Sequence, residues 1–535
     1  MSLKPEPVRA MPPETAELRG LIPEDSVYRL VGDTLYGKYN DADYADLYPT
    51  EGQPGISPVL LAFVTIFQFL EKLSDRAAAN AIRVRLDWKY ALHLPLNYAG
   101  FNFSVLSEFR DRVVQHGAEA RLFDSVLVQL REMGLLKRRG RQRTDSLAIL
   151  TKVRNLTRLE RLVETVRLAL RALLAADDNW VRTTVPPTWE DIYGQPCMHE
   201  KLTKAERDAL AERVGPDGQW LLERLQAEGT PEQLRELPEV KVLATVWQQQ
   251  FRLVEGELVA QEPGSYDGKT YIDTPHDPEA RYSAKRGKEW VGYKLQVTET
   301  DDEEMPHLLT DIAVTSSVET DYEALEAIQE RLEERDVLPA EQLGDKGYIT
   351  EDNLANSAKR GIDLIGPVKK ESWAHARNPG GITLDQFEVD LENLTAVCPA
   401  GQKATIGTSK GKRLAFRFRK AVCAACPLRA RCCTGKGARS LSVGRNYAML
   451  KAARARQETE EFKSLYRQHR GGIEGCLSGL VRGQGIRVGR YIGTAKIHFQ
   501  ALFTGAAANL RRAARWLAGE RPQAKRQGLR LSQSA

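Results

Sequence analysis

The first 56 residues are rich in Pro, Asp and Tyr, which predicts short helices and loops, and apolar side chains at helical spacing begin after them. From Ser57 the segment PVLLAFVTIFQFLEKL has the pattern of a buried helix, with Ser57 as its N-cap and a proline at its first position. Three amphipathic segments follow, SDRAAANAIRVRLDWKYAL, SVLSEFRDRVVQ and AEARLFDSVLVQLREMG, and Ser74 caps the first of them. We therefore predict an all-helical N-terminal domain of at least four helices over residues 1–136.

The pattern changes in residues 137–153, where a basic run leads into a short strand-like segment that contains Asp145. An alternative is that Asp145 caps a helix that begins at the same place. Residues 154–265 return to helical spacing in several amphipathic segments. Because they separate the first strand from the later ones, we interpret residues 154–265 as a helical insertion.

Strand character resumes in residues 266–392. Two alternating runs, WVGYKLQVTET and HLLTDIAVT, are joined by an acidic turn and followed by a capped amphipathic helix. A short strand then ends at Asp345, and IDLIGPV is a further candidate strand. This order predicts an α/β (α+β) fold in which helices cover a mixed sheet. Three segments complete the chain: a basic, cysteine-rich insert at 393–450, helices at 451–518 and a basic tail at 519–535.

The charge of the chain is unevenly distributed. The formal net charge of the 535 residues is only +5, from 77 basic and 72 acidic residues. Between Glu392 and Glu458, however, there is no acidic residue against fifteen Lys and Arg, which is typical of a surface that binds a polyanion. No apolar run reaches the roughly 18 residues needed to span a bilayer, and the N-terminus lacks the apolar core of a signal peptide. We therefore expect a cytoplasmic protein that does not contact membranes.

Four of the seven cysteines lie within residues 423 to 433. Cys398, the Cys423-x-x-Cys426 pair and Cys432 provide four thiols in two halves, with Cys433 as an alternative fourth. Tetrahedral zinc favours this arrangement, and one structural ion would order a Gly- and Lys-rich segment that can bury little apolar surface. The alternative is a set of free, buried thiols.

Three acids from distant parts of the chain are candidate metal ligands: Asp145, Asp345 and Glu474. Glu474 is the single acid in a segment otherwise rich in arginine, which suits a phosphate-bearing substrate. Arg470 and Glu474 could also form an ordinary surface ion pair four residues apart. Acids that meet at one sheet edge among Lys and Arg are typical of Mg²⁺-assisted phosphoryl transfer, in which two ions about 3.5 to 4 Å apart serve the attacking and the leaving oxygen.

The motifs resemble those of a known family when they are taken in order. FRDR follows a helical domain, and then come RTDS at 143–146, WVGYK, LGDKGY at 343–348, CPAGQ with CAACPLRARC, and RGGIEG with RYIGTAKIHFQ. This series resembles the DDE transposases of bacterial insertion sequences over most of the chain. One signature differs: Tyr466 precedes Arg470 by one residue more than in related enzymes, and Arg482 replaces a lysine one position late.

The resemblance implies a ribonuclease H-like catalytic core with flanking helices. It places Asp145 on the first strand, Asp345 at the end of the fourth and Glu474 on the helix after the insert. Asp267, Asp273 and Asp277 are alternatives for the first acid, and we prefer Asp145 because the first strand should precede the insertion. The resemblance also implies that the N-terminal domain binds the terminal inverted repeats of the element, and that Mg²⁺ or Mn²⁺ supports DNA cleavage and strand transfer.

We expect double-stranded DNA as the partner, bound by a homodimer because two DNA ends must be brought together. Seven basic residues near the acids are the candidate DNA contacts: Arg141, Arg143, Lys346, Arg470, Arg482, Arg487 and Arg490. Two other functions stay open. One is a zinc-stabilised DNA-binding repressor or inactive transposase relative, and the other is a structure-selective nuclease without strand transfer.

Overall fold

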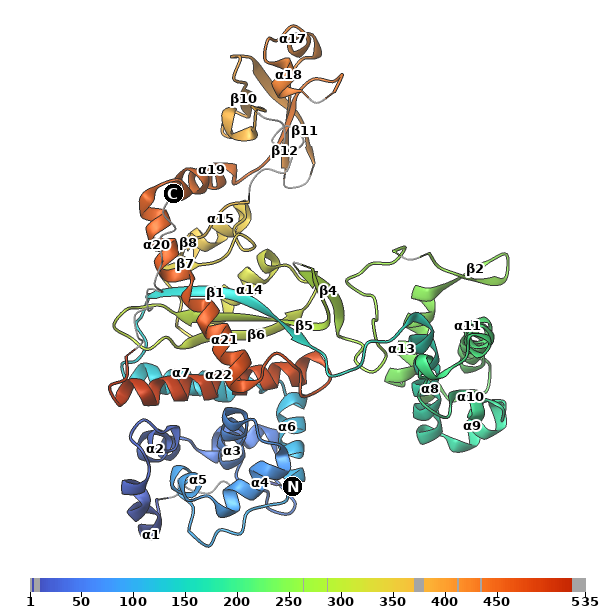
Figure 1. The fold of residues 1–535 in the computed structure, drawn as a ribbon, viewed down its shortest axis with the longest axis vertical. Coiled ribbons are helices and arrows are strands. Elements are labelled where there is room, and N and C mark those ends of the chain that lie inside the picture. The colour runs from blue at the N-terminus through green and yellow to red at the C-terminus, as the bar shows by residue number, and fades with distance from the viewer. Residues whose placement is uncertain are drawn as a thin grey trace, which may run out of the picture.

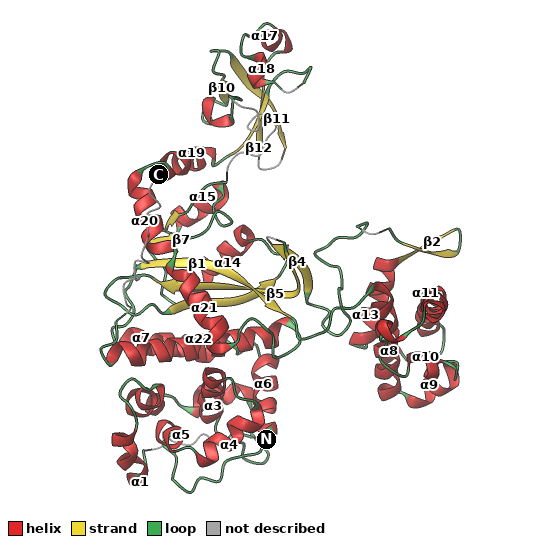
Figure 2. Cartoon of the chain, viewed as in Figure 1, coloured by secondary structure: helices red, strands yellow, loops and turns green. Residues whose placement is uncertain are grey.

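A computed structural model describes residues 2–3, 10–262, 264–285, 287–369, 380–410, 413–433 and 435–521. A central sheet is covered by helices, with the N-terminal helices below it, the helical insertion to one side and a smaller sheet above (Figures 1 and 2). Most of the predicted basic tail lies outside the described residues. Among the helices that are described, none is long and apolar enough to cross a membrane.

The described N-terminal region is built from helices joined by loops, and the predicted helical domain is present. Ser57 and Ser74 are the caps, since their hydroxyl oxygens accept hydrogen bonds from the backbone N–H groups of Leu60 and Ala77. The helices are α1 (Pro13–Ala16), α2 (Val27–Leu30), α3 (Pro58–Glu71), α4 (Asp75–Val84), α5 (Leu86–Ala91), α6 (Ser104–Gln115) and α7 (Arg121–Glu132).

The central sheet is mixed and has the strand order β4-β5-β1-β7-β8, with β6 also paired to β5. Its strands are β1 (Arg141–Leu150), β4 (Arg281–Lys285), β5 (Lys288–Thr300), β6 (Leu309–Ser316), β7 (Glu341–Leu343) and β8 (Asp363–Ile365). β5 runs antiparallel to β1 and β6 antiparallel to β5, whereas β1, β7 and β8 are parallel. Helices α14 (Asp321–Glu334) and α15 (Glu351–Lys359) supply the crossovers. The predicted α/β class and ribonuclease H-like sheet are confirmed.

The helical insertion leaves the sheet after β1 and returns before β4. It comprises α8 (Arg158–Ala176), α9 (Asp178–Thr184), α10 (Trp189–Tyr193), α11 (Lys204–Gln226), α12 (Glu232–Arg235) and α13 (Pro238–Gln250), which enclose their own apolar core. The chain then forms a hairpin, β2 (Phe251–Val254) and β3 (Glu257–Ala260), that the helical pattern did not predict.

The cysteine-rich insert folds as a separate sheet with the strand order β13-β12-β11-β10-β9. Its elements are β9 (Glu388–Asp390), β10 (Thr395–Val397), β11 (Lys403–Lys410), β12 (Arg413–Arg417), α17 (Lys420–Ala424), α18 (Arg429–Cys432) and β13 (Ser440–Gly444). Helices α19 (Tyr447–Gln457), α20 (Glu460–Arg470) and α21 (Gly472–Gln484) then lead back across the central sheet to α22 (Thr494–Leu517) (Figure 1).

Helix α22 joins the N-terminal helices to the sheet. It packs against β6 on one side and against α3 and α7 on the other, so most of its residues are buried. One apolar cluster therefore extends from Val27 in the N-terminal region to Ala514 in α22. Since both parts share one core, the N-terminal region cannot move far from the sheet without exposing apolar surface.

The segment that contains Glu474 is not one continuous helix. In one continuous helix, Arg470 and Glu474 would lie on one face at a spacing of four residues, but the helix is interrupted at Gly471, between α20 and α21. Just after the interruption, the backbone of Gly472 packs closely against the side chain of Arg143. A Cβ atom at position 472 would lie 1.9 Å from Nη1 of Arg143, so only glycine fits there. The start of α21 is thus pressed against the side chain of a residue on β1.

Arg143 itself is buried in a network of charged groups. Its guanidinium donates to Glu299 (2.7 Å) and Asp301 (2.5 Å), and also to the backbone carbonyl of His469 (3.0 Å). The His469 ring contacts Asp301 at 2.8 Å, and Arg512 pairs with Glu299 at 2.9 Å. Because each buried charge has several partners, the network holds the end of α20 against β1 and β5.

Replacing Arg143 with methionine should destabilise the protein by about 3 to 5 kcal/mol, since two buried carboxylates would lose a charged partner. Burial raises the pKa of Asp301, while Arg143 and His469 oppose that rise. The loss should therefore be largest near neutral pH and smaller in acid, where protonation removes the unpaired charge. Urea unfolding of the variant and of the unchanged protein, at neutral and at acid pH, measures this difference in the free energy of unfolding.

The matched control is Arg182→Met, which removes an exposed ion pair with Asp178 in the insertion. Such pairs contribute about 0 to 1 kcal/mol. Equal losses of stability in the two variants would contradict a structural role for the Arg143 network.

Candidate active site

Asp145, in the middle of β1, lies beside Asp345, which comes just after the end of the neighbouring strand β7. β1 and β7 are parallel, and their last paired residues are Arg143 and Leu343. Each aspartate follows two residues later, so the pairing register brings the two acids together. Burial raises the pKa of Asp145, and the nearby Asp345 adds to the rise, whereas Arg470 opposes it.

Helix α20 delivers Arg470 to this pair of acids. Its Nη2 atom donates to Oδ2 of Asp145 at 2.7 Å, and the two side chains are only 12% and 13% exposed. The Nε and Nη1 atoms of Arg470 are buried without a hydrogen-bond partner among the described atoms. One turn earlier, the hydroxyl of Tyr466 donates to the carbonyl of Gly344 (3.2 Å). Tyr466 therefore belongs to the site, although its spacing from Arg470 differs from the family signature.

Glu474 is placed in the first turn of α21, directly after the interruption at Gly471. Its side chain is exposed, and it makes no hydrogen bond or ion pair with any residue in the described ranges. The structure thus brings Asp145, Asp345 and Arg470 together, whereas the carboxylate of Glu474 does not contact them. Its role as the third ligand stays a prediction.

The candidate DNA contacts fall into two groups. Lys346, Arg482 and Arg487 are exposed, and Arg490 is half-buried with its guanidinium on the carbonyl of Leu73. Arg141 pairs with Glu341 at 2.6 Å, and Arg143 is buried in the network described above. Arg143 is buried and its donors are engaged inside the protein, so in this structure it does not face DNA.

The sequence pattern missed one acid near the pair, Asp321. It opens α14 directly after Thr320, which forms a capping box with Glu323. Acids in the first turn of a helix are common for reasons unrelated to chemistry, so the capping signal concealed it. Only the pairing of distant strands reveals that Asp321 lies near Asp345.

The carboxylates in the middle of β1 and just after β7 suit a divalent cation. Carboxylate oxygens are the donors that Mg²⁺ and Mn²⁺ prefer, and one or two carboxylates with water suffice for Mg²⁺. A cationic guanidinium already lies against Asp145, which indicates that positive charge is favourable there. Among the described residues, no group of three or more His, Cys, Asp or Glu side chains is arranged to hold a metal ion.

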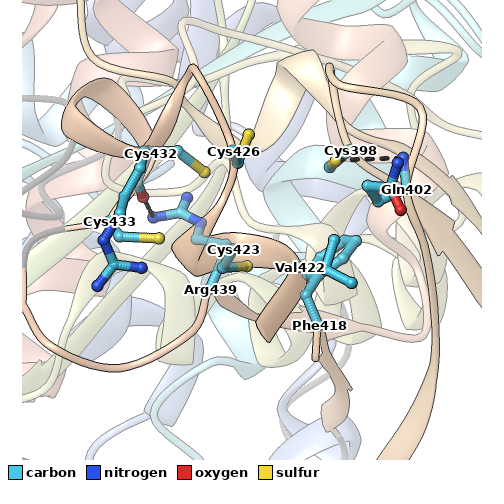
Figure 3. A pocket seen from close by; sticks show the side chains of 10 residues that line it. Cys398, Gln402, Phe418, Val422, Cys423, Cys426, Cys432, Cys433 and Arg439 are labelled. Carbon is cyan, nitrogen blue, oxygen red and sulfur yellow. Dashed lines mark hydrogen bonds between the residues drawn. The ribbon is translucent and has the colours of Figure 1, made fainter. Parts of the chain in front are cut away.

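Five cysteines of the insert line one small pocket, together with Phe418 and Arg439 (Figure 3). They are Cys398, Cys423, Cys426, Cys432 and Cys433, and none forms a disulfide. Thiolate sulfur is a preferred ligand of zinc, so the donor type fits. The five sulfur atoms surround the pocket, but no three of them are close enough together to hold an ion.

Two protein-family models match the chain. Residues 16–112 match a family described as a transposase domain (DUF772), and residues 397–514 match a family described as a transposase DDE domain. No curated protein and no solved structure matches. The first match covers most of the N-terminal helices, and the second covers the cysteine-rich insert with α19–α21 and most of α22. Both are transposase families, and together with the ribonuclease H-like sheet the two matches support a likeness to DDE transposases of the insertion-sequence type.

Proposed function

We propose that this chain is an insertion-sequence transposase that binds the terminal inverted repeats, cleaves the DNA there and joins the freed ends to a target. The observation that supports it best is the pair of acids in the middle of β1 and just after β7, with Arg470 reaching Asp145 from α20. Acids of this kind on a ribonuclease H-like sheet suit phosphoryl transfer, and the DDE family generally uses divalent metal.

The proposed ligands of two Mg²⁺ or Mn²⁺ ions are Asp145, Asp345 and Glu474. When bound, such ions lower the pKa of water and neutralise charge on the phosphate. Glu474 starts from an exposed position and reaches the pair as the first turn of α21 adjusts. The adjoining end of α20 stays in place during this movement, because Arg143 donates to the carbonyl of His469 there.

Arg470 is proposed to change partners during the reaction. Without DNA it neutralises Asp145, and two of its nitrogen atoms lack acceptors. In the complex, the guanidinium turns to the non-bridging oxygens of the scissile phosphate, which a planar fork of donors suits. It would thereby release Asp145 for the cation and orient the phosphate for in-line attack.

DNA would approach over the exposed basic residues around the site. Lys346 follows Asp345 directly, and Arg482 and Arg487 lie at the end of α21 and beyond it. The N-terminal helices would read the inverted repeats, and since they share a core with the sheet, the repeat they bind fixes where the DNA meets the acids. Two such ends require a homodimer, acting on DNA in the cytoplasm.

The cysteine-rich insert is proposed to bind one zinc ion. Cys398, Cys423, Cys426 and Cys432 are the proposed ligands, with Cys433 as the alternative to Cys432. All five side chains border one pocket, and binding of an ion would require the four ligand side chains to turn toward a common point. The ion would stiffen a basic segment that has a small apolar core of its own.

Replacing Glu474 with glutamine should abolish Mg²⁺-dependent cleavage while DNA binding is retained. We expect cleavage to fall by more than about a hundredfold, the upper end of what changes around metal ligands cost. The assay is nicking and joining of linear DNA that carries the repeats flanking the coding region, with a mobility shift for binding.

Glu461→Gln is the matched control, because Glu461 is an exposed acid in the first turn of the neighbouring helix. It should cleave like the unchanged protein. Full cleavage by Glu474→Gln would refute the role of Glu474. DNA binding by the unchanged protein without any nicking would favour the repressor, and cleavage without joined products would favour the nuclease.

Elemental analysis of the purified protein should find about one zinc per chain. The content should fall when Cys423 and Cys426 are replaced by serine, and stay unchanged in Cys197→Ser, whose thiol lies in the helical insertion. Separate replacement of Cys432 and Cys433 identifies the fourth ligand as the one whose loss lowers the zinc content. A zinc-free protein would contradict this proposal without affecting the acids.

A further inference from the structure

The smaller sheet has one apolar face and one basic face. On β12 and directly after it, Leu414, Phe416 and Phe418 are buried in the core of this sheet. Arg417 and Arg419 alternate with them and are exposed, because successive side chains of a strand point to opposite faces. Arg419 follows the last residue of β12 but is still extended, with φ −69° and ψ 135°. The two arginines therefore lie in one row on the outer face.

A neighbouring strand adds a third cation to this row. Thr405 on β11 pairs with Arg417, and Lys403 lies two residues before Thr405, so it is on the same face of the sheet. Lys403 is exposed as well. On the other side of β12, the residue that pairs with Arg417 is the small Ser440 of β13. We call Lys403, Arg417 and Arg419 the basic face.

The charge of the basic face has no counterpart in its neighbourhood. Arg413, at the start of β12, lies 3.5 Å from Glu351 on α15, but Arg417 and Arg419 make no ion pair with an acid in the described ranges. The strands of this sheet carry acids only in β9, which β10 and β11 separate from β12. Three strand spacings amount to about 14 Å, which exceeds the screening length of about 8 Å at physiological salt.

Exposed cations are common on solvated surfaces, but such surfaces usually mix the two signs of charge. Helix α11 is an example, since Lys204 and Arg207 alternate there with Glu206 and Asp208. Residues 393–457 instead contain fifteen Lys and Arg and no acid. Like charges at this density repel one another and destabilise the compact state, unless an anion is bound. The basic face is thus built for a partner with many negative charges.

The chemistry of the basic face favours the DNA backbone. The planar guanidinium of arginine matches the oxygens of a phosphate, and phosphate contacts carry no sequence information. A partner bound in this way is held regardless of its sequence. The basic face also lies on the other side of the central sheet from the N-terminal helices, which are proposed to read the repeats (Figure 1). Duplex DNA is stiff over roughly 150 base pairs, so a contact away from the acids still holds the duplex in position.

We propose that the basic face of the smaller sheet binds the phosphate backbone of the target DNA. This inference rests on the proposed function, and it adds a surface for the target that is separate from the surface for the repeats. It also gives a reason for the absence of acids from residues 393–457.

The test measures binding of the full-length protein to a DNA duplex without the repeats, by fluorescence anisotropy at several salt concentrations. The double variant Arg417→Gln, Arg419→Gln should lower the slope of log affinity against log salt concentration by about two, since each neutralised phosphate contributes about 0.9. Joining of cleaved ends to this duplex should fall by about tenfold or more, because fewer targets are held. Cleavage at the repeats should stay unchanged.

The matched control is Lys204→Gln, Arg207→Gln, which removes the same charge from α11. It should bind and join DNA like the unchanged protein, and thermal melting shows whether each variant is folded. If the basic-face variant matches this control, the face is merely solvated and the inference is overturned. An equal loss of cleavage at the repeats would overturn it too, because the face would then hold the DNA of the element.

The double variant Arg417→Lys, Arg419→Lys separates the charge from the local structure. It keeps both charges and should keep the salt slope; a slope as low as that of the glutamine variant would contradict phosphate binding. Tighter binding of an RNA duplex of the same length would overturn the assignment to DNA. A protein that never cleaves the repeats, but whose slope still falls in the glutamine variant, would refute the cleavage function while supporting DNA binding by the basic face.

Discussion

Arg143 carries its charge into the interior of the protein, and the geometry of the candidate site depends on the partners that it finds there. Desolvation of an isolated guanidinium would be prohibitive, but Glu299, Asp301 and the carbonyl of His469 each accept hydrogen bonds from it. These contacts join β1 and β5 to the last turn of α20. Arg470 directly follows His469, so these contacts hold its guanidinium within reach of Asp145. Asp145 is two positions after Arg143 on β1 and therefore lies on the same face of the strand.

The second constraint is the shared apolar core around α22. Small side chains along this helix allow close packing against β6, α3 and α7 together. The N-terminal helices are consequently part of one body with the sheet, whereas the helical insertion and the cysteine-rich sheet have cores of their own. Under the proposed function this rigidity matters, because the N-terminal helices that would bind the repeat would then set the position at which the sheet would cut.

Much of the fold could be predicted because it depends on local pattern. Caps such as Ser57 and the alternation in β5 lie within one segment of sequence, and both are confirmed. Properties that arise from distant segments could not be predicted. Arg143 reads as a DNA contact in a basic run, yet its partners on β5 lie more than 150 residues away and bury it. Asp321 reads as a helix-capping acid until the sheet brings it to Asp345. The interruption at Gly471 depends equally on the fold, because it brings Gly472 against Arg143.

The central claim is that Asp145, Asp345 and Glu474 hold divalent cations at one place. Iron-directed cleavage of the polypeptide tests it most directly: Fe²⁺ replaces Mg²⁺ in the DNA-bound protein, ascorbate and peroxide generate hydroxyl radicals at the bound ion, and mass spectrometry locates the cuts. The account predicts cuts in three segments, around residues 145, 345 and 474, and their joint loss in Asp145→Asn. Cuts near residues 145 and 345 with none near 474, or no cuts at all, would contradict it.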